Sequence, residues 1–174
     1  INLAMGVARQ TTGKVLLIDG DLRKPGIAAT LGIEVSSGLS DLLSGAAPLE
    51  ACMLAAPGGR LFILPQTRAL AYSSELLANG VLSELGERVR REFRDWTVIV
   101  DCPPVLAVDD TLVILQAVDK ALLVVREGRT RRDEMRRAAE AIGREKYLGA
   151  VLNDSRAAGD RGSYYYYDYG YEER

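Results

Sequence analysis

The amino-acid sequence predicts an α/β fold with a mostly parallel sheet and helices on both faces. Short runs rich in valine, leucine and isoleucine recur along the chain, and they are nearly continuous in hydrophobicity, as in strands covered on both sides. Segments with the apolar spacing of helices lie between these runs, and such alternation indicates a parallel sheet. The expected strands are residues 14–19, 60–65, 97–101, 120–126 and 148–153.

Helices are expected between these strands. Apolar residues at spacings of three and four predict a helix near residues 74–94, with Leu82, Leu85, Val89 and Phe93 on its buried side. Thr130 and the acidic residue three positions later fit a capping box, which starts a second helix that reaches about residue 144. A short helix follows Pro25, and residues 33–59 are expected to be loops around further short helices.

The length of 174 residues, 48% of them hydrophobic, fits one globular domain. Residues 1–153 are expected to form this domain, and residues 154–174 a flexible linker and a tyrosine-rich tail, since apolar periodicity stops there. The opening residues look like the second half of an amphipathic helix without a start signal. We therefore expect the domain to be truncated at its N-terminus.

Composition excludes several classes of function. The formal net charge of −2 gives no general reason to expect nucleic-acid binding. With two cysteines and no histidine, the chain has neither a disulfide framework nor the ligands of a cysteine-based or histidine-based metal site. No apolar run approaches the ~18–20 residues of a membrane span. A reducing, cytoplasmic setting is the simplest interpretation.

Two strand ends are acidic. In VLLIDGDLRKP, residues 15–25, the alternation of an extended chain puts Asp19, Asp21 and Arg23 on one face just beyond the strand. In TVIVDCPPVL, residues 97–106, an apolar strand closes on Asp101, the usual place for a carboxylate that helps to hold Mg²⁺ in nucleotide-hydrolysing folds. The alternatives are a polar loop with its own ion pair and a carboxylate that caps the next segment.

These motifs make the chain resemble a known family. LLIDGDLRKP looks like the Walker A-prime motif, and VIVDCPP the Walker B motif, of the bacterial tyrosine kinases, polysaccharide-biosynthesis autokinases related to deviant P-loop ATPases. The likeness extends to GLSDLLSG at 38–45, SELL at 74–77, VVREGRT at 124–130 and the last strand. It also includes the C-terminal tyrosine cluster, which is the site of autophosphorylation in that family.

The resemblance implies the roles of individual residues, with ATP and Mg²⁺ as cofactors. Asp19 and Asp21 would be catalytic, with Asp19 as the base that accepts the proton of a tyrosine hydroxyl. Asp21 and Asp101 would support the Mg²⁺ shell, mainly through water. Asn153 matches the family position near the adenine base, although a turn residue that ends a strand is the alternative. The expected phosphorylation sites are Tyr164, Tyr165, Tyr166, Tyr167, Tyr169 and Tyr171.

Two departures from the family pattern matter. The phosphate-binding loop GxxxxGK[ST], expected just before INLA, is absent together with its strand, so this chain by itself should bind ATP poorly and phosphorylate little. The segment after the second expected strand reads LPQTRALAYSSELL, where the family usually has a glycine and a proline-rich turn. This second departure concerns the peptide-side loop and not the metal site.

The resemblance also implies partners and a place in the cell. These are a ring-like homo-oligomer in which the tail of one subunit enters the site of its neighbour, a membrane activator that regulates chain length, and a phosphotyrosine phosphatase. The domain would work on the cytoplasmic side of the plasma membrane in capsule or exopolysaccharide synthesis and export. The linker of roughly ten residues before Tyr164 spans ~35 Å when extended, so phosphorylation within one chain is equally compatible with its length.

Two other functions fit parts of the sequence. A partitioning or positioning ATPase of the same superfamily would explain the acidic strand ends but not the tyrosine tail, and it would typically end in a membrane-binding segment. A catalytically dead binding module would explain the absent phosphate loop. The basic run at 126–137 is interpreted as a solvated helix face with ion pairs, with a membrane-surface or phosphotyrosine-binding patch as the alternative. Cys102 is interpreted as a small apolar filler.

Overall fold

The computed structural model describes residues 1–70 and 81–155 of the chain. Its helices are α1 (Asn2–Gln10), α2 (Ile27–Leu31), α3 (Leu39–Leu43), α4 (Leu49–Cys52), α6 (Val81–Glu92), α7 (Asp110–Ala117) and α8 (Arg132–Ile142). Its strands are β1 (Val15–Asp19), β2 (Leu54–Ala55), β3 (Leu61–Leu64), β4 (Thr97–Asp101), β5 (Ala121–Arg126) and β6 (Tyr147–Asn153). All five predicted strands are therefore confirmed, and the two-residue β2 is an addition.

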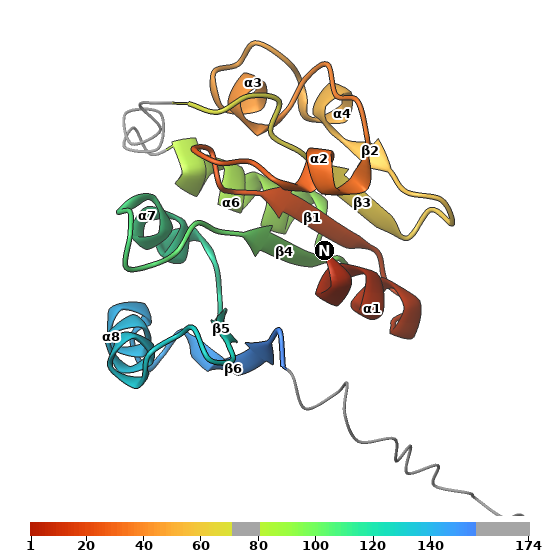
Figure 1. Cartoon of the computed structure of the whole chain (residues 1–174). Coiled ribbons are helices and arrows are strands. Elements are labelled where there is room, and N and C mark those ends of the chain that lie inside the picture. Colours follow the sequence, from red (N-terminus) through yellow and green to blue (C-terminus); the bar gives the residue numbers. More distant parts are fainter. Residues whose placement is uncertain (71–80, 156–174) are drawn as a thin grey trace, which may run out of the picture.

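The described strands form two sheets instead of one. The larger has the order β2-β3-β1-β4 and the smaller consists of β5 and β6. Every pair is parallel except the short β2–β3 pair, which confirms the mostly parallel α/β class. In Figure 1, the β5–β6 pair lies on the β4 side of the larger sheet. The two sheets thus present the edge strands β4 and β5, and an unpaired edge can accept a further strand.

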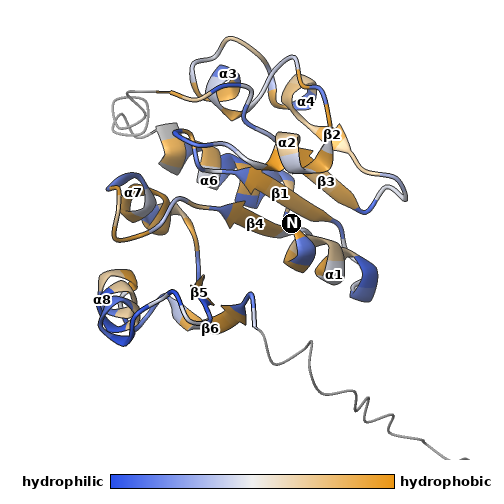
Figure 2. Cartoon of the chain, in the orientation of Figure 1, coloured by the Kyte–Doolittle hydropathy of each residue, from blue (hydrophilic) through white to orange (hydrophobic). Residues whose placement is uncertain are grey.

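Helices cover both faces of the larger sheet, because alternate side chains of β1 point to opposite sides. Val15 and Leu17 join one cluster with α1 and α2, whereas Leu16 and Ile18 join the other with α3 and α4. All four side chains are buried, and Figure 2 shows the strands as the hydrophobic centre of the molecule. The continuous apolar run of β1 reflects this burial on both sides.

Two helix predictions need correction or completion. The helix predicted near 74–94 is confirmed over α6, and residues 71–80 lie outside the described part. The capping box at Thr130 is wrong, since α8 begins one residue later and Glu134 accepts the backbone N–H of Arg131 at 2.8 Å. The Thr130 hydroxyl instead accepts the N–H of Arg126 at 2.8 Å and closes the turn after β5.

The helix α7 has no counterpart among the predictions, because it lacks a polar stripe to reveal its period. Lys146, which lies just before β6, caps its C-terminal end. The ammonium group of Lys146 donates to the carbonyls of Leu115, of Gln116 at 3.4 Å and of Val118 at 2.8 Å. Positive charge at a helix C-terminus is favourable because the last carbonyls have no partner within the helix.

The unusual LPQT segment packs against the start of α3. The Cβ of any residue replacing Gly38 would lie 2.4 Å from the Pro65 carbonyl oxygen, so only glycine fits this close approach. Gln66 is buried, and its side-chain oxygen accepts the N–H of Ser40 at 2.9 Å. In this chain, a glutamine therefore stands where the family pattern has glycine and supplies a hydrogen bond to the first turn of α3.

Candidate functional site

The carboxyl ends of β1 and β4 bring the predicted acidic residues together. The register of the two parallel strands pairs Asp19 directly with Asp101. The chain then continues from β1 toward β4, because the N–H of Gly20 donates to the carbonyl of Asp101 at 2.8 Å. A Cβ at Gly20 would lie 2.8 Å from that same carbonyl oxygen, which leaves no room for another residue. Both predicted strand tips thus meet at one edge of the sheet.

Asp19 is completely buried and organises the loop that follows β1. Its Oδ2 atom accepts the backbone N–H groups of Gly26 at 3.1 Å and of Ile27 at 3.0 Å. Its Oδ1 atom is buried and has no hydrogen-bond partner among the described residues. One oxygen of this carboxylate is therefore used by the protein, and the other is left for a ligand or a proton.

The pKa of Asp19 is raised above its ordinary value of 3.8. The largest cause is burial, which disfavours the charged form, and the hydrogen bonds from Ile27 and Gly26 oppose it. The neighbouring charge of Asp101 raises the pKa further. A carboxylate whose proton affinity is increased in this way is a better general base than an exposed aspartate.

Asp21 is held in a tight turn by its own backbone. Its Oδ1 atom accepts the N–H of Arg23 at 3.2 Å and that of Lys24 at 2.8 Å. Such a turn fixes the carboxylate in one orientation. The predicted convergence of Asp19, Asp21 and Arg23 is only partly correct, since the guanidinium of Arg23 extends to Asp110 instead, with Nε 2.9 Å from Oδ2.

Asp110 is the residue at this edge that the sequence analysis missed. It begins α7, its side chain is 1% exposed, and it accepts two hydrogen bonds from Arg23. A buried carboxylate needs such a partner to offset its desolvation. The acidic pair 109–110 after an apolar strand was the available signal, but sequence alone does not distinguish its buried member from its exposed one.

The residues at this edge fit a magnesium-nucleotide only with help from other ligands. Among residues 1–70 and 81–155, no group of three or more potential ligand side chains could hold a metal ion by itself. Mg²⁺ usually keeps several waters and takes one or two carboxylates together with phosphate oxygens. The fixed carboxylate of Asp21 and that of Asp101 at the end of β4 match that chemistry.

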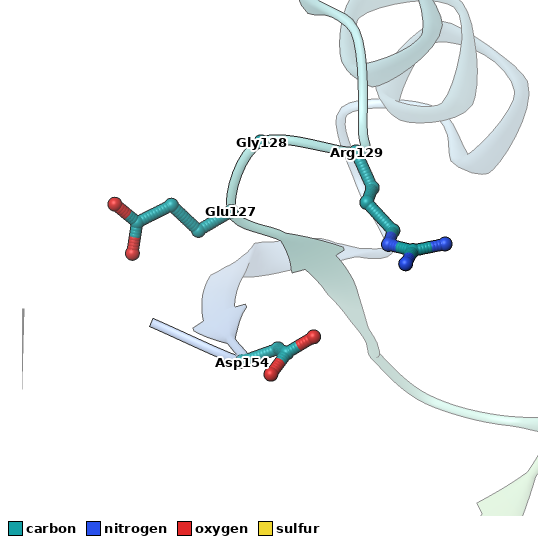
Figure 3. Close-up of a pocket in the computed structure, with 4 residues that line it drawn as sticks. All are labelled: Glu127, Gly128, Arg129 and Asp154. Carbon is teal, nitrogen blue, oxygen red and sulfur yellow. The ribbon is translucent and has the colours of Figure 1, made fainter. Parts of the chain in front are cut away.

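A second feature lies at the carboxyl ends of β5 and β6. Figure 3 shows a pocket lined by Glu127, Gly128, Arg129 and Asp154, with Glu127 and Arg129 pointing in different directions. Asn153, the predicted adenine-side residue, precedes this pocket, and its side-chain oxygen accepts the N–H of Asp154 at 2.9 Å. Asp154 also pairs with Arg126 at 2.7 Å. The six predicted phosphorylation sites lie outside the described residues.

The basic run of residues 126–137 is largely paired in the described part. On α8, Arg136 pairs with Glu140 at 3.0 Å and Arg137 with Asp133 at 3.7 Å, each across one helical turn. Such exposed pairs each contribute about 0.3–0.5 kcal/mol. These contacts match the interpretation of the run as a solvated helix face.

Cys102 follows Asp101 directly, so the reactivity of its thiol reports on burial and negative charge at the site. Burial, and then the charges of Asp101 and Asp21, raise the pKa of its thiol to about 12. Because the thiolate is the reactive form, we expect iodoacetamide at pH 8 to modify Cys102 about 100-fold more slowly in the folded protein than in urea. Buried Cys52, whose pKa is also raised, should behave alike. Rapid labelling of Cys102 in the folded protein would contradict this geometry.

The chain is similar to curated tyrosine-protein kinases. It is 33% identical to YwqD of Bacillus subtilis over 87% of this chain and 64% of that protein. It is 31% identical to CpsD of Streptococcus agalactiae over 94% of this chain and 73% of that protein. It therefore spans less than two thirds of the length of YwqD. No family model matches the sequence.

Solved structures agree with these relatives. The kinase domain of VpsO superposes with a TM-score of 0.79 at 34% identity, covering 87% of this chain and 74% of that one. The septum site-determining protein MinD from Pyrococcus horikoshii, complexed with Mg-ADP, has a TM-score of 0.70 at 22% identity, covering 87% of this chain and 61% of that one. The MinD likeness concerns the P-loop ATPase fold alone. From the identity with CpsD over most of both chains, we conclude that this chain belongs to the bacterial tyrosine-protein kinase family.

Proposed function

We propose that this chain is most of the kinase domain of a protein-tyrosine autokinase that phosphorylates its own C-terminal tyrosines and thereby regulates capsule or exopolysaccharide synthesis. The observation that supports this most directly is the pairing of Asp19 with Asp101 at the carboxyl edge of the sheet, beside the fixed carboxylate of Asp21. Ligands of open α/β sheets bind at that edge. The membership in a kinase family makes phosphoryl transfer the reaction that fits this edge.

The proposed reaction assigns a task to each carboxylate. The oxygen of a tyrosine hydroxyl attacks the γ-phosphorus of ATP, the bond from that phosphorus to the β–γ bridging oxygen breaks, and ADP leaves. Asp19 accepts the hydroxyl proton on Oδ1, which has no hydrogen-bond partner among the described residues. Asp21 and Asp101 orient the magnesium-nucleotide, through water. Bound Mg²⁺ supplies charge that stabilises the transferring phosphoryl group.

The phosphate loop is the missing part of this site. We propose that a strand and phosphate loop outside this 174-residue chain complete the site. The edges of β4 and β5 that are unpaired among the described strands, and the greater length of YwqD, support this. In the proposed enzyme, the backbone amides and lysine of that loop bind the β- and γ-phosphates. Asn153 and the neighbouring pocket at β5 and β6 would then face the adenine base.

The direct test is phosphate transfer by the full-length protein. With γ-labelled ATP and Mg²⁺, we expect label on the cluster Tyr164–Tyr171, and the isolated 174-residue chain should incorporate little. Replacing the six cluster tyrosines by phenylalanine should remove most of the label. The matched control, Tyr147→Phe at the half-buried start of β6, should leave it unchanged. Release of the label only as inorganic phosphate would favour a positioning-type ATPase.

The proposed assembly follows the same reasoning. A ring of subunits would let the tail of one chain reach the acidic edge of another. Each phosphate then adds about −1.5 to −2 charge beside three acidic tail residues, so phosphorylated tails would repel one another. A phosphotyrosine phosphatase would reset the tail. No helix in the described ranges is long and apolar enough to cross a membrane. We also propose that a membrane activator recruits the domain to the inner face of the plasma membrane.

A further inference from the structure

One ion pair links the two acidic loops of the site. Arg23 lies in the loop after β1, and Asp110 begins the helix α7 that follows β4. The guanidinium donates from Nε to Oδ2 at 2.9 Å and from a terminal nitrogen to Oδ1 at 3.2 Å. This two-point contact restricts both the distance and the orientation of the loops, which a single hydrogen bond does not.

On one side, the pair is connected to Asp21 through the backbone. The N–H groups of Arg23 and Lys24 both donate to Asp21 Oδ1, at 3.2 and 2.8 Å. The residue that pairs with Asp110 through its side chain thus also holds the Asp21 carboxylate through its backbone.

On the other side, the pair is connected to the loop after Asp101. The neighbour of Asp110, Thr111, is buried, and its hydroxyl donates to the carbonyl of Pro103 at 2.7 Å. The first turn of α7 thus contacts the loop of Asp21 through one residue and the loop of Asp101 through the next. Asp110 is buried, with 1% of its side chain exposed, so its charge depends on protein partners such as Arg23.

We infer that Arg23 and Asp110 are positioning residues that set Asp21 relative to Asp101 for the divalent cation that accompanies ATP. This inference rests on the proposed function. Neither residue needs to touch the cation, since the partners that orient metal ligands change metal affinity about 10–100-fold when they are altered. Arg23 is specified as arginine because only a planar, two-point donor meets both oxygens of Asp110.

The test compares two ways of altering the pair in the full-length protein. Arg23→Lys keeps the charge but loses the second hydrogen bond. Arg23→Met combined with Asp110→Leu replaces the pair by apolar side chains, so that neither charge of the pair remains without the other. The matched control, Arg88→Lys, alters a half-buried arginine on α6 that pairs with Glu92 at 2.9 Å.

Cation binding is measured as Mn²⁺ affinity by electron paramagnetic resonance in the presence of ADP, beside the Mg²⁺ dependence of tail phosphorylation. We expect the Mn²⁺ dissociation constant and the half-saturating Mg²⁺ concentration to rise about tenfold in both pair variants, and neither to change in the control. Melting profiles confirm that the proteins compared are folded.

Unchanged Mn²⁺ affinity in a folded Arg23→Lys or double variant would overturn the inference and leave the pair a structural feature. Failure of the proposed function gives a different result. The unmodified protein would then label no tyrosine, whereas failure of the inference leaves that labelling intact and the variants indistinguishable from it in cation affinity.

Discussion

Asp19→Asn should abolish tyrosine phosphorylation and at the same time stabilise the folded protein at neutral pH. Asparagine cannot accept the hydroxyl proton, and loss of a general base costs about 100-fold or more in rate. Its side-chain oxygen can still accept the N–H groups of Gly26 and Ile27. The amide also removes a buried negative charge beside Asp101, so we expect the free energy of unfolding at pH 7 to increase.

The pH dependence gives this prediction its sign. The pKa of Asp19 is higher in the folded protein than in the unfolded chain, where it is near 3.8. Protonated Asp19 therefore favours the folded state fully below pH 3.8, and this contribution to stability is lost as the pH rises through the pKa of the folded protein. The variant should therefore exceed the parent in stability at pH 7, and the gap should close toward pH 3. Denaturation in urea at several pH values, followed by fluorescence of the single Trp96, measures the gap.

The control for this experiment is Asp95→Asn, an exposed aspartate in the loop before β4, which should leave both activity and stability unchanged. If Asp19→Asn phosphorylates at the parental rate, Asp19 is not the base. If the variant is instead less stable at pH 7, the carboxylate stabilises the loop more than its burial destabilises it.

Gly20→Ala should damage the fold and the site together. The new methyl group would lie 2.8 Å from both the Asp101 carbonyl oxygen and a methyl carbon of Val100, and the carbonyl belongs to a sheet that cannot move aside cheaply. We expect a loss of about 1–3 kcal/mol in unfolding free energy. The loop must also shift away from β4, and a displacement of about 1 Å can reduce a catalysed rate about 100-fold.

The matched control is Gly6→Ala in α1, where an added Cβ would meet no atom within 4 Å. Alanine in a helix interior is favoured over glycine by about 0.5–1 kcal/mol, so this variant should gain stability. Urea denaturation and labelling of the tail compare the two proteins directly. Equal stabilities for Gly20→Ala and the parent would show that the loop after β1 does not pass this close to β4.

The sequence predicted the framework of the site because its central strand, β1, is buried on both faces. The expectation that every strand is covered in this way is wrong for β6, which is mostly exposed. Continuous apolar runs such as 15–18 and 98–100 give a strong signal for strands, and the acidic residue that ends each run stands out clearly. Parallel pairing then brings the two ends to one edge without further information. The pairing of Asp19 with Asp101 confirms that their placement on neighbouring strands was predictable.

Other contacts could not be predicted from local patterns. The helix α7 is apolar on most sides, so no period distinguishes it from a strand or a loop. Arg23 was expected to lie with Asp19 and Asp21, but its guanidinium bonds to Asp110, which is 87 positions away in the sequence. Only the folded arrangement reveals this contact. The prediction that Thr130 caps α8 was wrong because its hydroxyl instead accepts the backbone N–H of Arg126 in the preceding turn.

The anchoring of α7 at both ends has a mechanical consequence. Its first turn is tied to the loops of the larger sheet through Asp110 and Thr111, and its last turn is tied through Lys146 to the start of β6. No described strand of one sheet is hydrogen-bonded to a strand of the other, so α7 connects the two sheets through its hydrogen bonds. A shift of β6 relative to the larger sheet would therefore be transmitted through α7 to the loops that follow β1 and β4.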